Sequence, residues 1–298
     1  MTTHSNKFYI NNELYYTIKR IKNRIIYIPC DELKAKQRFF LNAVKWVYPY
    51  KANILNSAKI HSGKKWILKM DIKSFYDSVP SHEISNVVKK VHERINKLDN
   101  FLSYLSLVTI NGKLPTGAPT SSHIANACFK KIDKEIMSVS SAFDVDYTRY
   151  VDDLIFSSYC KETLKIIENK VTALLEYHGY KINQKKTKYV SDNKQQNILG
   201  LVVNNYRVRL PKDFKREIRA MLHSYAINIC NSRIKNTKHL AWDIKRIRQL
   251  EGYISYINNV DSKFYVQLKR YAKKLEHKYC VIITIFEKKK YINQETDL

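Results

Sequence analysis

The stretch YTRYVDDLIFS, residues 147–157, places two adjacent aspartates inside what otherwise reads as a buried β-hairpin. The residues around Asp152 and Asp153 are aromatic, β-branched or aliphatic, types that favour a half-buried pleated sheet. Two neighbouring carboxylates in such surroundings repel each other and are costly to bury unless a cation holds them. A solvated turn between two strands is the ordinary alternative for an Asp-Asp pair, so the rest of the chain must decide between the two interpretations.

A third carboxylate lies in WILKMDIKSFYDSVP, residues 66–80, which reads as a strand ending at Pro80. Asp71 follows the apolar part of this run and precedes the aromatic pair Phe75 and Tyr76. If this strand lies beside the hairpin, three carboxylates converge at one edge of a sheet. Hard oxygen ligands of this kind suit Mg²⁺, and two ions about 4 Å apart can activate a hydroxyl and stabilise a departing pyrophosphate. The sequence therefore predicts a site for two Mg²⁺ ions, with Mn²⁺ as the alternative.

The charge balance points to a polyanionic partner. The chain has 298 residues, with 53 Lys and Arg against 27 Asp and Glu and a formal net charge of +26. Such a field attracts nucleic acid or an anionic membrane surface. The 22 tyrosines and 11 phenylalanines offer stacking surfaces beside cationic groups, which favours single-stranded nucleic acid.

The sequence argues against a membrane span, a secretion signal, a zinc site and a disulfide framework. No run of about 18 apolar residues occurs, and the run CVIITIF at 280–286 reads better as a buried strand. The five cysteines are scattered without a CxxC pair, and their number is odd. A reducing cytoplasm fits this pattern.

The hydrophobic periodicity predicts an α+β protein with a helical C-terminal third. Residues 7–29 read as two strands joined by KRIKNR, followed by a helix that has Asp31 as its N-cap and buries Leu33, Gln37, Phe40, Leu41, Val44 and Val47. Residues 82–110 also read as helical. Three further helices are predicted after Pro211, with apolar faces formed by Phe214, Ile218, Met221, Leu222 and Tyr225, by Leu240, Ile244, Ile247, Leu250, Ile254 and Ile257, and by Phe264, Leu268, Tyr271, Leu275 and Tyr279.

The other faces of these three helices are strongly basic, with Lys215, Arg219, Arg246 and Lys269 among their residues. Such charges are ordinarily a solvated surface, but their nearly single sign favours a phosphate-facing bundle.

A segment of small residues, LPTGAPTSSHIANACF at 114–129, lies between the two acidic motifs. Gly117 and Pro119 predict a tight turn that leads into a helix. Alone this is an ordinary turn and cap, but it would also let a nucleotide pack closely against the backbone.

Taken in order, the acidic strand, the LPxGAPxS segment and the YxDD hairpin resemble a bacterial reverse transcriptase, most closely the retron type. The resemblance runs from about residue 15 to 275. It includes RIIYIPCDELKAKQ in the fingers, GYKINQKKTKYV after the hairpin, NILGLVV as the primer-grip strand and LEGYISYINNVDSKF in the thumb.

The resemblance implies roles for individual residues. Asp71, Asp152 and Asp153 would be catalytic metal ligands, together with the backbone carbonyl of Ile72. Tyr76 would be the steric gate that favours dNTPs, unless it is simply a core aromatic. The implied nucleotide-binding residues are Arg24, with Arg20 and Lys22 as fallbacks, Tyr76, Gly117, Ala118 and Lys186, the last either assisting pyrophosphate release or merely solvated. The implied nucleic-acid contacts are Tyr150, Leu199, Gly200, Lys215, Arg219, Arg246 and Lys269.

The sequence departs from the family pattern in several places. Thr116 replaces a glutamine that contacts the nucleotide, and Ser122 replaces a proline. The retron-type N-A-x-x-H reads SAKIH, with Ser57 for Asn and His61 retained, and V-T-G reads Ile198, Leu199, Gly200. His61 is open to two interpretations, a surface or core-edge histidine or an RNA contact.

The resemblance implies a right-hand polymerase: fingers at 1–64 (a strand pair plus a helix), a palm at 65–207 of antiparallel sheet with helices on one face and inserted fingers helices at about 82–112, and a basic helical thumb with a C-terminal tail at 208–298. The expected function is RNA-directed DNA synthesis from dNTPs on a structured non-coding RNA from its own locus. Priming from a guanosine 2′-OH would yield branched RNA-DNA (msDNA), and a separate effector protein would complete an anti-phage system.

Three alternatives remain open. The first is another defence-associated or group II intron-like reverse transcriptase with a different template and priming mode. The second is a non-catalytic RNA-binding protein with a polymerase fold, for which eroded metal ligands would be expected. The third, a basic protein on an anionic membrane, lacks an amphipathic surface helix.

Overall fold

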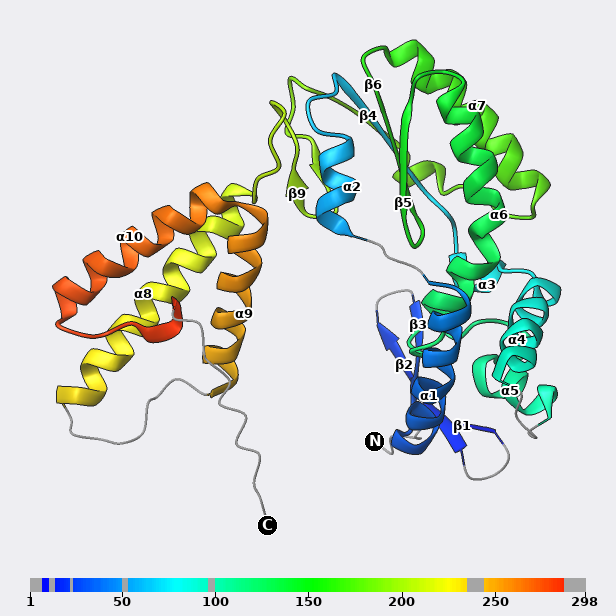
Figure 1. Ribbon diagram of the computed structural model, residues 1–298, viewed down its shortest axis with the longest axis horizontal. Coiled ribbons are helices and arrows are strands. Elements are labelled where there is room, and N and C mark those ends of the chain that lie inside the picture. The colour runs from blue at the N-terminus through cyan, green and yellow to red at the C-terminus, as the bar shows by residue number, and fades with distance from the viewer. Residues whose placement is uncertain are drawn as a thin grey trace. The chain divides into compact units, whose positions relative to one another are not determined.

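The computed structural model describes residues 7–10, 14–21, 24–49, 53–95, 100–234 and 244–286. The chain divides into two compact units, Met1–Gln196 and Asn197–Leu298, which are described separately (Figure 1). The finer division into fingers, palm and thumb stays a prediction.

The first unit begins with a three-stranded antiparallel sheet rather than the predicted strand pair. The strands are β1 (Lys7–Ile10), β2 (Leu14–Ile21) and β3 (Arg24–Pro29), in the order β1-β2-β3. Most of the KRIKNR segment, predicted as a turn, pairs as strand, because Ile21 lies opposite Arg24 in the β2–β3 register. Its two central residues, 22 and 23, lie outside the described residues.

The predicted first helix is α1 (Asp31–Val47), which buries Leu33, Gln37, Phe40, Leu41 and Val44. Its N-cap is Cys30 rather than Asp31, whose carboxylate instead lies in the first turn, where it complements the helix dipole. The helical prediction for 82–110 corresponds to α4 (Ser81–Ile95) and α5 (Phe101–Val108).

The central sheet has the strand order β5-β6-β4-β7 and is antiparallel throughout. Its strands are β4 (Trp66–Asp71), β5 (Asp146–Tyr150), β6 (Asp153–Ser158) and β7 (Lys188–Ser191). The strand predicted to reach Pro80 ends at Asp71, because Ser74 takes a left-handed conformation (φ 50°) and the short helix α3 (Phe75–Ser78) follows.

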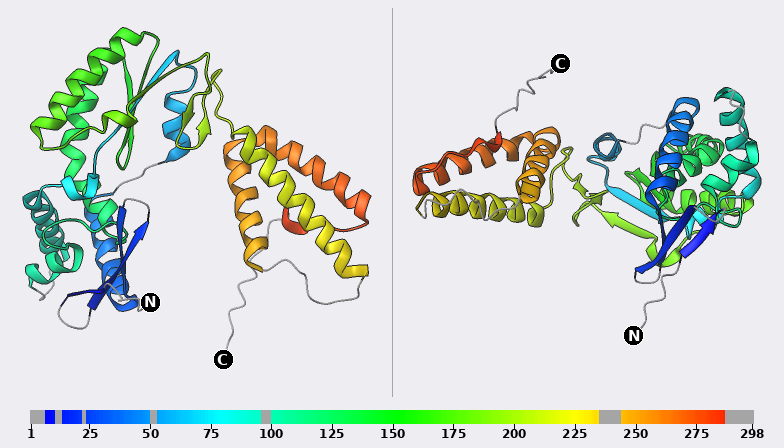
Figure 2. Two further views of the ribbon diagram at one scale, coloured as in Figure 1. Left: turned by 180° about the vertical axis from the view of Figure 1, so that it is seen from behind. Right: turned by 90° about the horizontal axis from the view of Figure 1, so that it is seen from below.

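Two long helices cover one face of the central sheet, and one short helix contacts the other face. Two long helices, α6 (Ser121–Ser141) and α7 (Lys161–Tyr177), lie side by side on one face, where Phe156 joins the main core (Figure 2). The shorter α2 (Ile54–Ile60) contacts β5, and its C-cap residue His61 hydrogen-bonds Ser157, which points to the opposite face from Phe156.

The second unit contains a two-stranded hairpin and the three predicted helices. The hairpin consists of β8 (Asn197–Ile198) and β9 (Leu201–Val202), and the helices are α8 (Lys212–Ile234), α9 (Ile244–Val260) and α10 (Ser262–Tyr279). Most of the predicted apolar positions are buried or half-buried, but Ile244 is 66% exposed at the start of α9. Leu240 lies outside the described residues.

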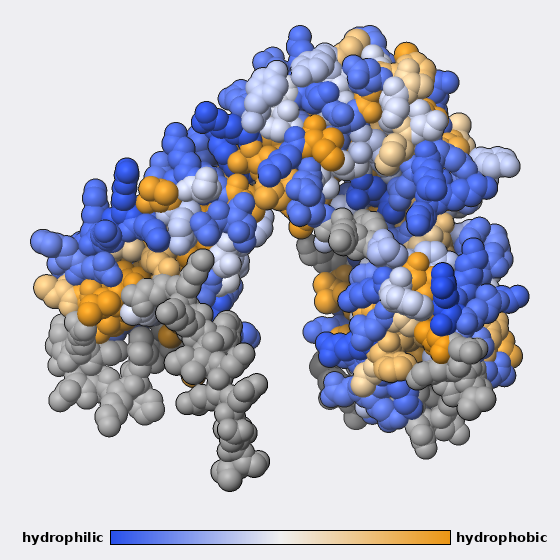
Figure 3. All heavy atoms as spheres, in the orientation of Figure 1, coloured by the Kyte–Doolittle hydropathy of each residue, from blue (hydrophilic) through white to orange (hydrophobic). Residues whose placement is uncertain are grey.

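The apolar run at 280–286 is not the predicted strand. Val281, Ile283 and Ile285 are buried, but the segment is irregular and ends in a short 3₁₀ helix, Thr284–Phe286. Residues 287–298, predicted as a tail, lie outside the described part of the chain. None of the helices described here combines the length and apolar character that a bilayer span requires. Figure 3 shows a largely hydrophilic visible surface with apolar residues in scattered groups.

Candidate active site

Strand register brings the three predicted aspartates together. β4 pairs with β6 so that Asp71 lies directly opposite Asp153. Beyond the end of β4, the amide of Ile72 donates to the carbonyl of Asp152 at 3.0 Å. The prediction that the strand carrying Asp71 lies beside the hairpin is therefore confirmed.

The hairpin turn that presents Asp152 is strained. Tyr150 pairs with Asp153, so Val151 and Asp152 form a two-residue turn. Val151 has φ 58°, in the left-handed region, where β-branched residues are genuine outliers and where such turns usually place glycine. Strain of this kind persists only where the surrounding structure holds it in place.

A buried arginine holds this turn, and the sequence analysis did not identify it. Arg149 Nη1 donates to the carbonyl of Val151 at 2.7 Å and to Asn126 Oδ1 at 2.8 Å. Its Nε and Nη2 bind the two carboxylate oxygens of Asp133 at 2.8 and 2.6 Å. The guanidinium also lies 4.5 Å from the centre of the Phe129 ring. The available sequence signal was that Arg149 shares its strand face with Tyr147, an unusual place for an unpaired charge.

The carboxylates of Asp152 and Asp153 lie in surroundings that disfavour their negative charge, so a nearby positive charge would stabilise them. Burial and the nearby Asp71 raise the pKa of Asp152, although its own backbone hydrogen bond lowers it. Burial, Asp152 and Asp71 raise the pKa of Asp153. Lys186 partly balances this charge, because its Nζ lies 2.6 Å from Asp71 Oδ1.

The three aspartates open into a cavity of about 950 Å³. It is also lined by other residues assigned to the site from sequence, namely Arg24, Ile72, Tyr76, Tyr150 and Lys186. Burial, then Asp152 and Tyr150, raise the pKa of Tyr76, so its hydroxyl stays protonated at neutral pH. The fallback Arg20 is absent from this lining, and Lys22 lies outside the described residues.

Gly117 and Ala118 are not among the residues that line the cavity, whereas the neighbouring Thr116 is. Gly117 has φ +112°, and a Cβ there would lie 2.6 Å from the carbonyl oxygen of Tyr27. The amide of Tyr27 in turn donates to the carbonyl of Thr116 at 2.8 Å. The glycine therefore lets this segment dock on β3, the strand that carries Arg24.

The other residues assigned to nucleic-acid binding lie in the second unit. Leu199 and Gly200 form the turn between β8 and β9, with φ 48° and 86°. Arg219, Arg246 and Lys269 are exposed on the three helices. Lys215 is different, because its Nζ is 2.6 Å from Asp261 Oδ2 and only 21% of its side chain is exposed.

Asp261 and His61 belong to the stretches that resemble the retron type. Both side chains form hydrogen bonds within the protein. Burial acts to raise the pKa of Asp261, but hydrogen bonds from Lys215 and from the amides of Phe264 and Leu210 bring it below its ordinary value. His61 is fully buried, with Nδ1 2.7 Å from Ser157 Oγ and Nε2 2.8 Å from Thr148 Oγ1. It is therefore a core residue, and its interpretation as an RNA contact is wrong.

Within the described residues, no group of three or more His, Cys, Asp or Glu side chains is arranged as a ready metal cluster. The donor chemistry of the three aspartates nevertheless fits Mg²⁺, because carboxylate oxygens are hard ligands. Asp152 and Asp153, whose pKa values are raised, gain further from a divalent ion. The contact of Lys186 with Asp71 occupies one of these oxygens.

A comparison with protein families leads to the same conclusion as the motif order, the paired carboxylates and the antiparallel sheet. The model described as "Reverse transcriptase (RNA-dependent DNA polymerase)" matches residues 17–203. The chain belongs to this family. It is an RNA-directed DNA polymerase, and the predicted α+β right-hand polymerase fold is confirmed.

Within the family, the chain is similar to retron reverse transcriptases. It is 29% identical over 268 residues to the Escherichia coli retron Ec86 reverse transcriptase, covering 86% of this chain and 78% of that protein. It is 28% identical over 279 residues to the E. coli retron Ec83 enzyme, covering 87% and 86%. It is 30% identical over 240 residues to the Myxococcus xanthus retron Mx162 enzyme, covering 67% of this chain and half of that protein. The predicted retron resemblance is confirmed.

Among solved structures, a telomerase from Candida albicans in complex with a telomeric RNA fragment aligns with a TM-score of 0.49 and 13% identity. The alignment covers 91% of this chain and 61% of the telomerase chain.

Proposed function

We propose that this enzyme copies a structured non-coding RNA from its own locus into single-stranded DNA, starting from the 2′-OH of a guanosine to give branched RNA-DNA. The observation that carries the proposal is the pairing of Asp71 with Asp153 beside Asp152 in an enzyme similar to retron reverse transcriptases. Branched priming is a property inferred from that similarity.

The proposed metal ligands are Asp71, Asp152, Asp153 and the carbonyl of Ile72, and the proposed cofactors are two Mg²⁺ ions. When bound, such ions supply a more nucleophilic hydroxyl and stabilise the leaving pyrophosphate. The raised pKa values of Asp152 and Asp153 support this assignment, because a cation lowers the cost of holding both carboxylates ionised.

The cavity residues have proposed roles toward the nucleotide. Arg24 binds the triphosphate, since a guanidinium can bind phosphate oxygens in a bidentate manner. Lys186 would release Asp71 and bind the departing pyrophosphate. Its side chain is long and 46% exposed, which allows this movement. Tyr76 acts as the gate beneath the sugar. Gly117 and Ala118 are proposed to pack against the nucleotide, and the neighbouring Thr116 lines the cavity.

The product strand and its RNA would be held by Tyr150 in the first unit and by basic residues of the second. Of the cations proposed there, Arg219, Arg246 and Lys269 are exposed and suited to phosphate contacts. Lys215 is better assigned to the structure of the helical unit, because Asp261 already binds its ammonium group. Leu199 and Gly200 would contact the primer through their turn.

In the cell, the enzyme would act in the cytoplasm with a separate effector protein as part of an anti-phage retron. The similarity to retron enzymes supports the retron context.

The test is to express the protein with its flanking DNA intact and to analyse the nucleic acid that co-purifies. We expect a short single-stranded DNA joined to RNA, sensitive separately to DNase and RNase, and shortened by a debranching enzyme. The Asp152→Asn variant should bind RNA but contain no DNA. DNA without a branch would reject the priming mode and favour another class of bacterial reverse transcriptase, and DNA made by the Asp152→Asn variant would reject the catalytic assignment.

A further inference from the structure

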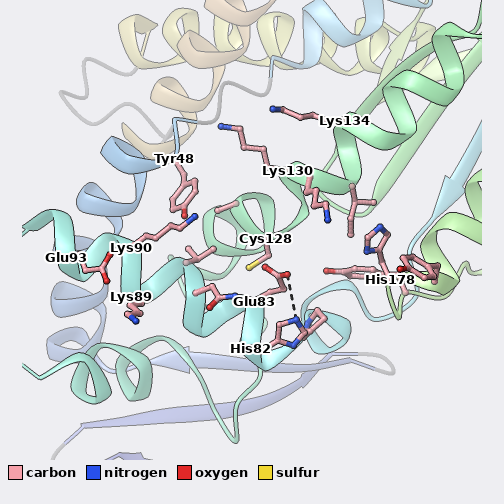
Figure 4. Close-up of a pocket in the computed structure, with 18 residues that line it drawn as sticks. Tyr48, His82, Glu83, Lys89, Lys90, Glu93, Cys128, Lys130, Lys134 and His178 are labelled. Atoms are coloured by element: carbon pink, nitrogen blue, oxygen red, sulfur yellow. Dashed lines mark ion pairs between the residues drawn. The ribbon is translucent and has the colours of Figure 1, made fainter.

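The first unit has a second hollow, of about 970 Å³, between α4 and α6. Figure 4 shows Lys130 and Lys134 extending from α6 toward the wall formed by Tyr48 and Lys90. This hollow and the catalytic cavity have no lining residue in common. We call it the α4–α6 groove.

The groove is lined by five exposed lysines, Lys89, Lys90, Lys130, Lys131 and Lys134, against two glutamates, Glu83 and Glu93. None of the five lysines forms an ion pair with any described residue. Lys130 and Lys134 are four residues apart on α6 and so lie on one face of that helix. Like charges at this spacing repel each other, which costs stability unless an anion lies between them.

A smaller hollow of about 360 Å³ adjoins the groove and shares Tyr48, Lys90 and Glu93 with it. Arg94 lines this extension, four residues after Lys90 on α4, and its guanidinium lies 5.6 Å from the ring centre of Trp46. The cationic face of α4 therefore continues beyond the main hollow.

Exposed aromatic rings accompany these cations. Trp46 beside the extension is 65% exposed, and Tyr177 on the rim of the groove is 85% exposed. Rings interspersed with Lys and Arg are the combination that stacks on bases while the cations bind the backbone.

The bottom of the groove is not suited to covalent chemistry. The thiol of Cys128 is buried, and burial raises its pKa to about 12, so it stays protonated and poorly reactive at neutral pH. The groove is thus better explained as a binding surface than as a second reaction site.

We propose that the α4–α6 groove binds the phosphodiester backbone of nucleic acid outside the catalytic cavity. The polymerase cavity handles the nucleotide and the growing end, whereas this surface would hold a distant part of a folded RNA or of its DNA product. The charges and rings favour nucleic acid over an acidic protein, which would satisfy the lysines but would not require the exposed rings. The proposal does not depend on how synthesis is primed.

The test compares two double variants of the full chain. The groove variant is Lys130→Gln/Lys134→Gln, and the matched control is Lys165→Gln/Lys188→Gln, which removes the same charge from exposed lysines of the first unit that line neither hollow. Binding of a labelled RNA hairpin with single-stranded tails, of the DNA hairpin of the same sequence and of polyglutamate is titrated at several salt concentrations. Extension of a primer on a short homopolymer template and the thermal midpoint are measured in parallel.

We expect the groove variant to bind a hairpin more weakly, with the slope of log Kd against log salt reduced by about 1 for each lost phosphate contact, so by about 2. The control should keep the native slope, and both variants should keep primer extension and the thermal midpoint. Loss confined to the RNA or the DNA hairpin identifies which nucleic acid lies in the groove. Native hairpin binding by the groove variant, or loss of polyglutamate binding alone, overturns the proposal. Failure of the unmodified enzyme to extend the primer would instead count against the proposed function.

Discussion

Replacement of Arg149 should lower both the stability of the protein and the rate of catalysis, and a second substitution should restore only the stability. Arg149→Met leaves the Asp133 carboxylate, 25% exposed, without its bidentate partner, and leaves the carbonyl of Val151 without its donor. Removing one partner of a buried ion pair costs about 3–5 kcal/mol. Because Asp133 keeps some contact with solvent, we expect the lower end, about 3 kcal/mol.

The double variant Arg149→Met/Asp133→Asn removes the unpaired charge and keeps an oxygen that can accept the Tyr147 hydroxyl, which Asp133 Oδ1 accepts at 2.8 Å. We expect it to recover most of the lost stability. The carbonyl of Val151 still lacks its donor, so nothing from Arg149 holds the turn in its strained conformation. The turn can then relax, which releases about 1–3 kcal/mol of strain. Since each 1.36 kcal/mol is tenfold in rate, kcat should stay lowered by a factor of about 5 to 150.

Urea unfolding and single-turnover primer extension, measured well below the melting temperature of every variant, give the two quantities. Asp133→Asn alone shows what the loss of the carboxylate does by itself. If the double variant regains kcat together with stability, Arg149 acts only through stability, and the argument from the strained turn is refuted.

Two further changes test other parts of the first unit. Lowering the pH from 8 to 5 should remove about 2 kcal/mol of stability through His61, because burial lowers its folded pKa to about 4 from an ordinary 6.5, and stability present above pH 6.5 is lost as the pH falls toward 4. Asp146 raises and Lys64 lowers this pKa, and a His61→Gln variant with the same pH dependence of urea unfolding would contradict the assignment. Gly117→Ala should destabilise the protein by about 1–3 kcal/mol, because its φ of +112° and the Tyr27 carbonyl leave no room for a Cβ. An unchanged urea midpoint in that variant would show that the segment does not dock tightly on β3.

Much of the active site could be predicted from the sequence because its residues lie in local patterns. Asp71 ends a run of strand-forming residues, and Asp152 and Asp153 interrupt another. The sequence alone therefore shows three charged residues at positions where burial is expected. Their meeting required one assumption, that the two strands are neighbours, and the β4–β6 register confirms it.

The supporting contacts could not be predicted, because their partners are distant in the sequence. Arg149 binds Asp133 and Asn126, and no local pattern connects these residues. In the sequence, Lys215 resembles many other surface cations, but its ammonium group binds Asp261, the N-cap of α10. The close approach of Gly117 to the carbonyl of Tyr27 likewise joins residues that lie far apart in the sequence.

Local sequence is also a poor guide to secondary structure or to burial where tertiary packing outweighs local preference. The run at 280–286 has the composition of a strand, yet no strand pairs with it among the described residues, and it packs as irregular chain. His61 shows the reverse case, a polar residue at the end of a short helix that is nevertheless buried. Two hydroxyl groups on the neighbouring sheet, those of Ser157 and Thr148, bind its ring nitrogens.

The pairing of Asp71 with Asp153 also limits which insertions and deletions this gene can tolerate. Side chains alternate along a strand, so one added or lost residue that shifted the β4–β6 register would turn one carboxylate to the opposite face. A two-residue shift would restore the face but displace the carboxylate by about 6.6 Å, too far to share an ion with its partner. Length changes among natural relatives should therefore be excluded between Trp66 and Asp71 and between Asp146 and Ser158, and should accumulate in the connections outside these strands.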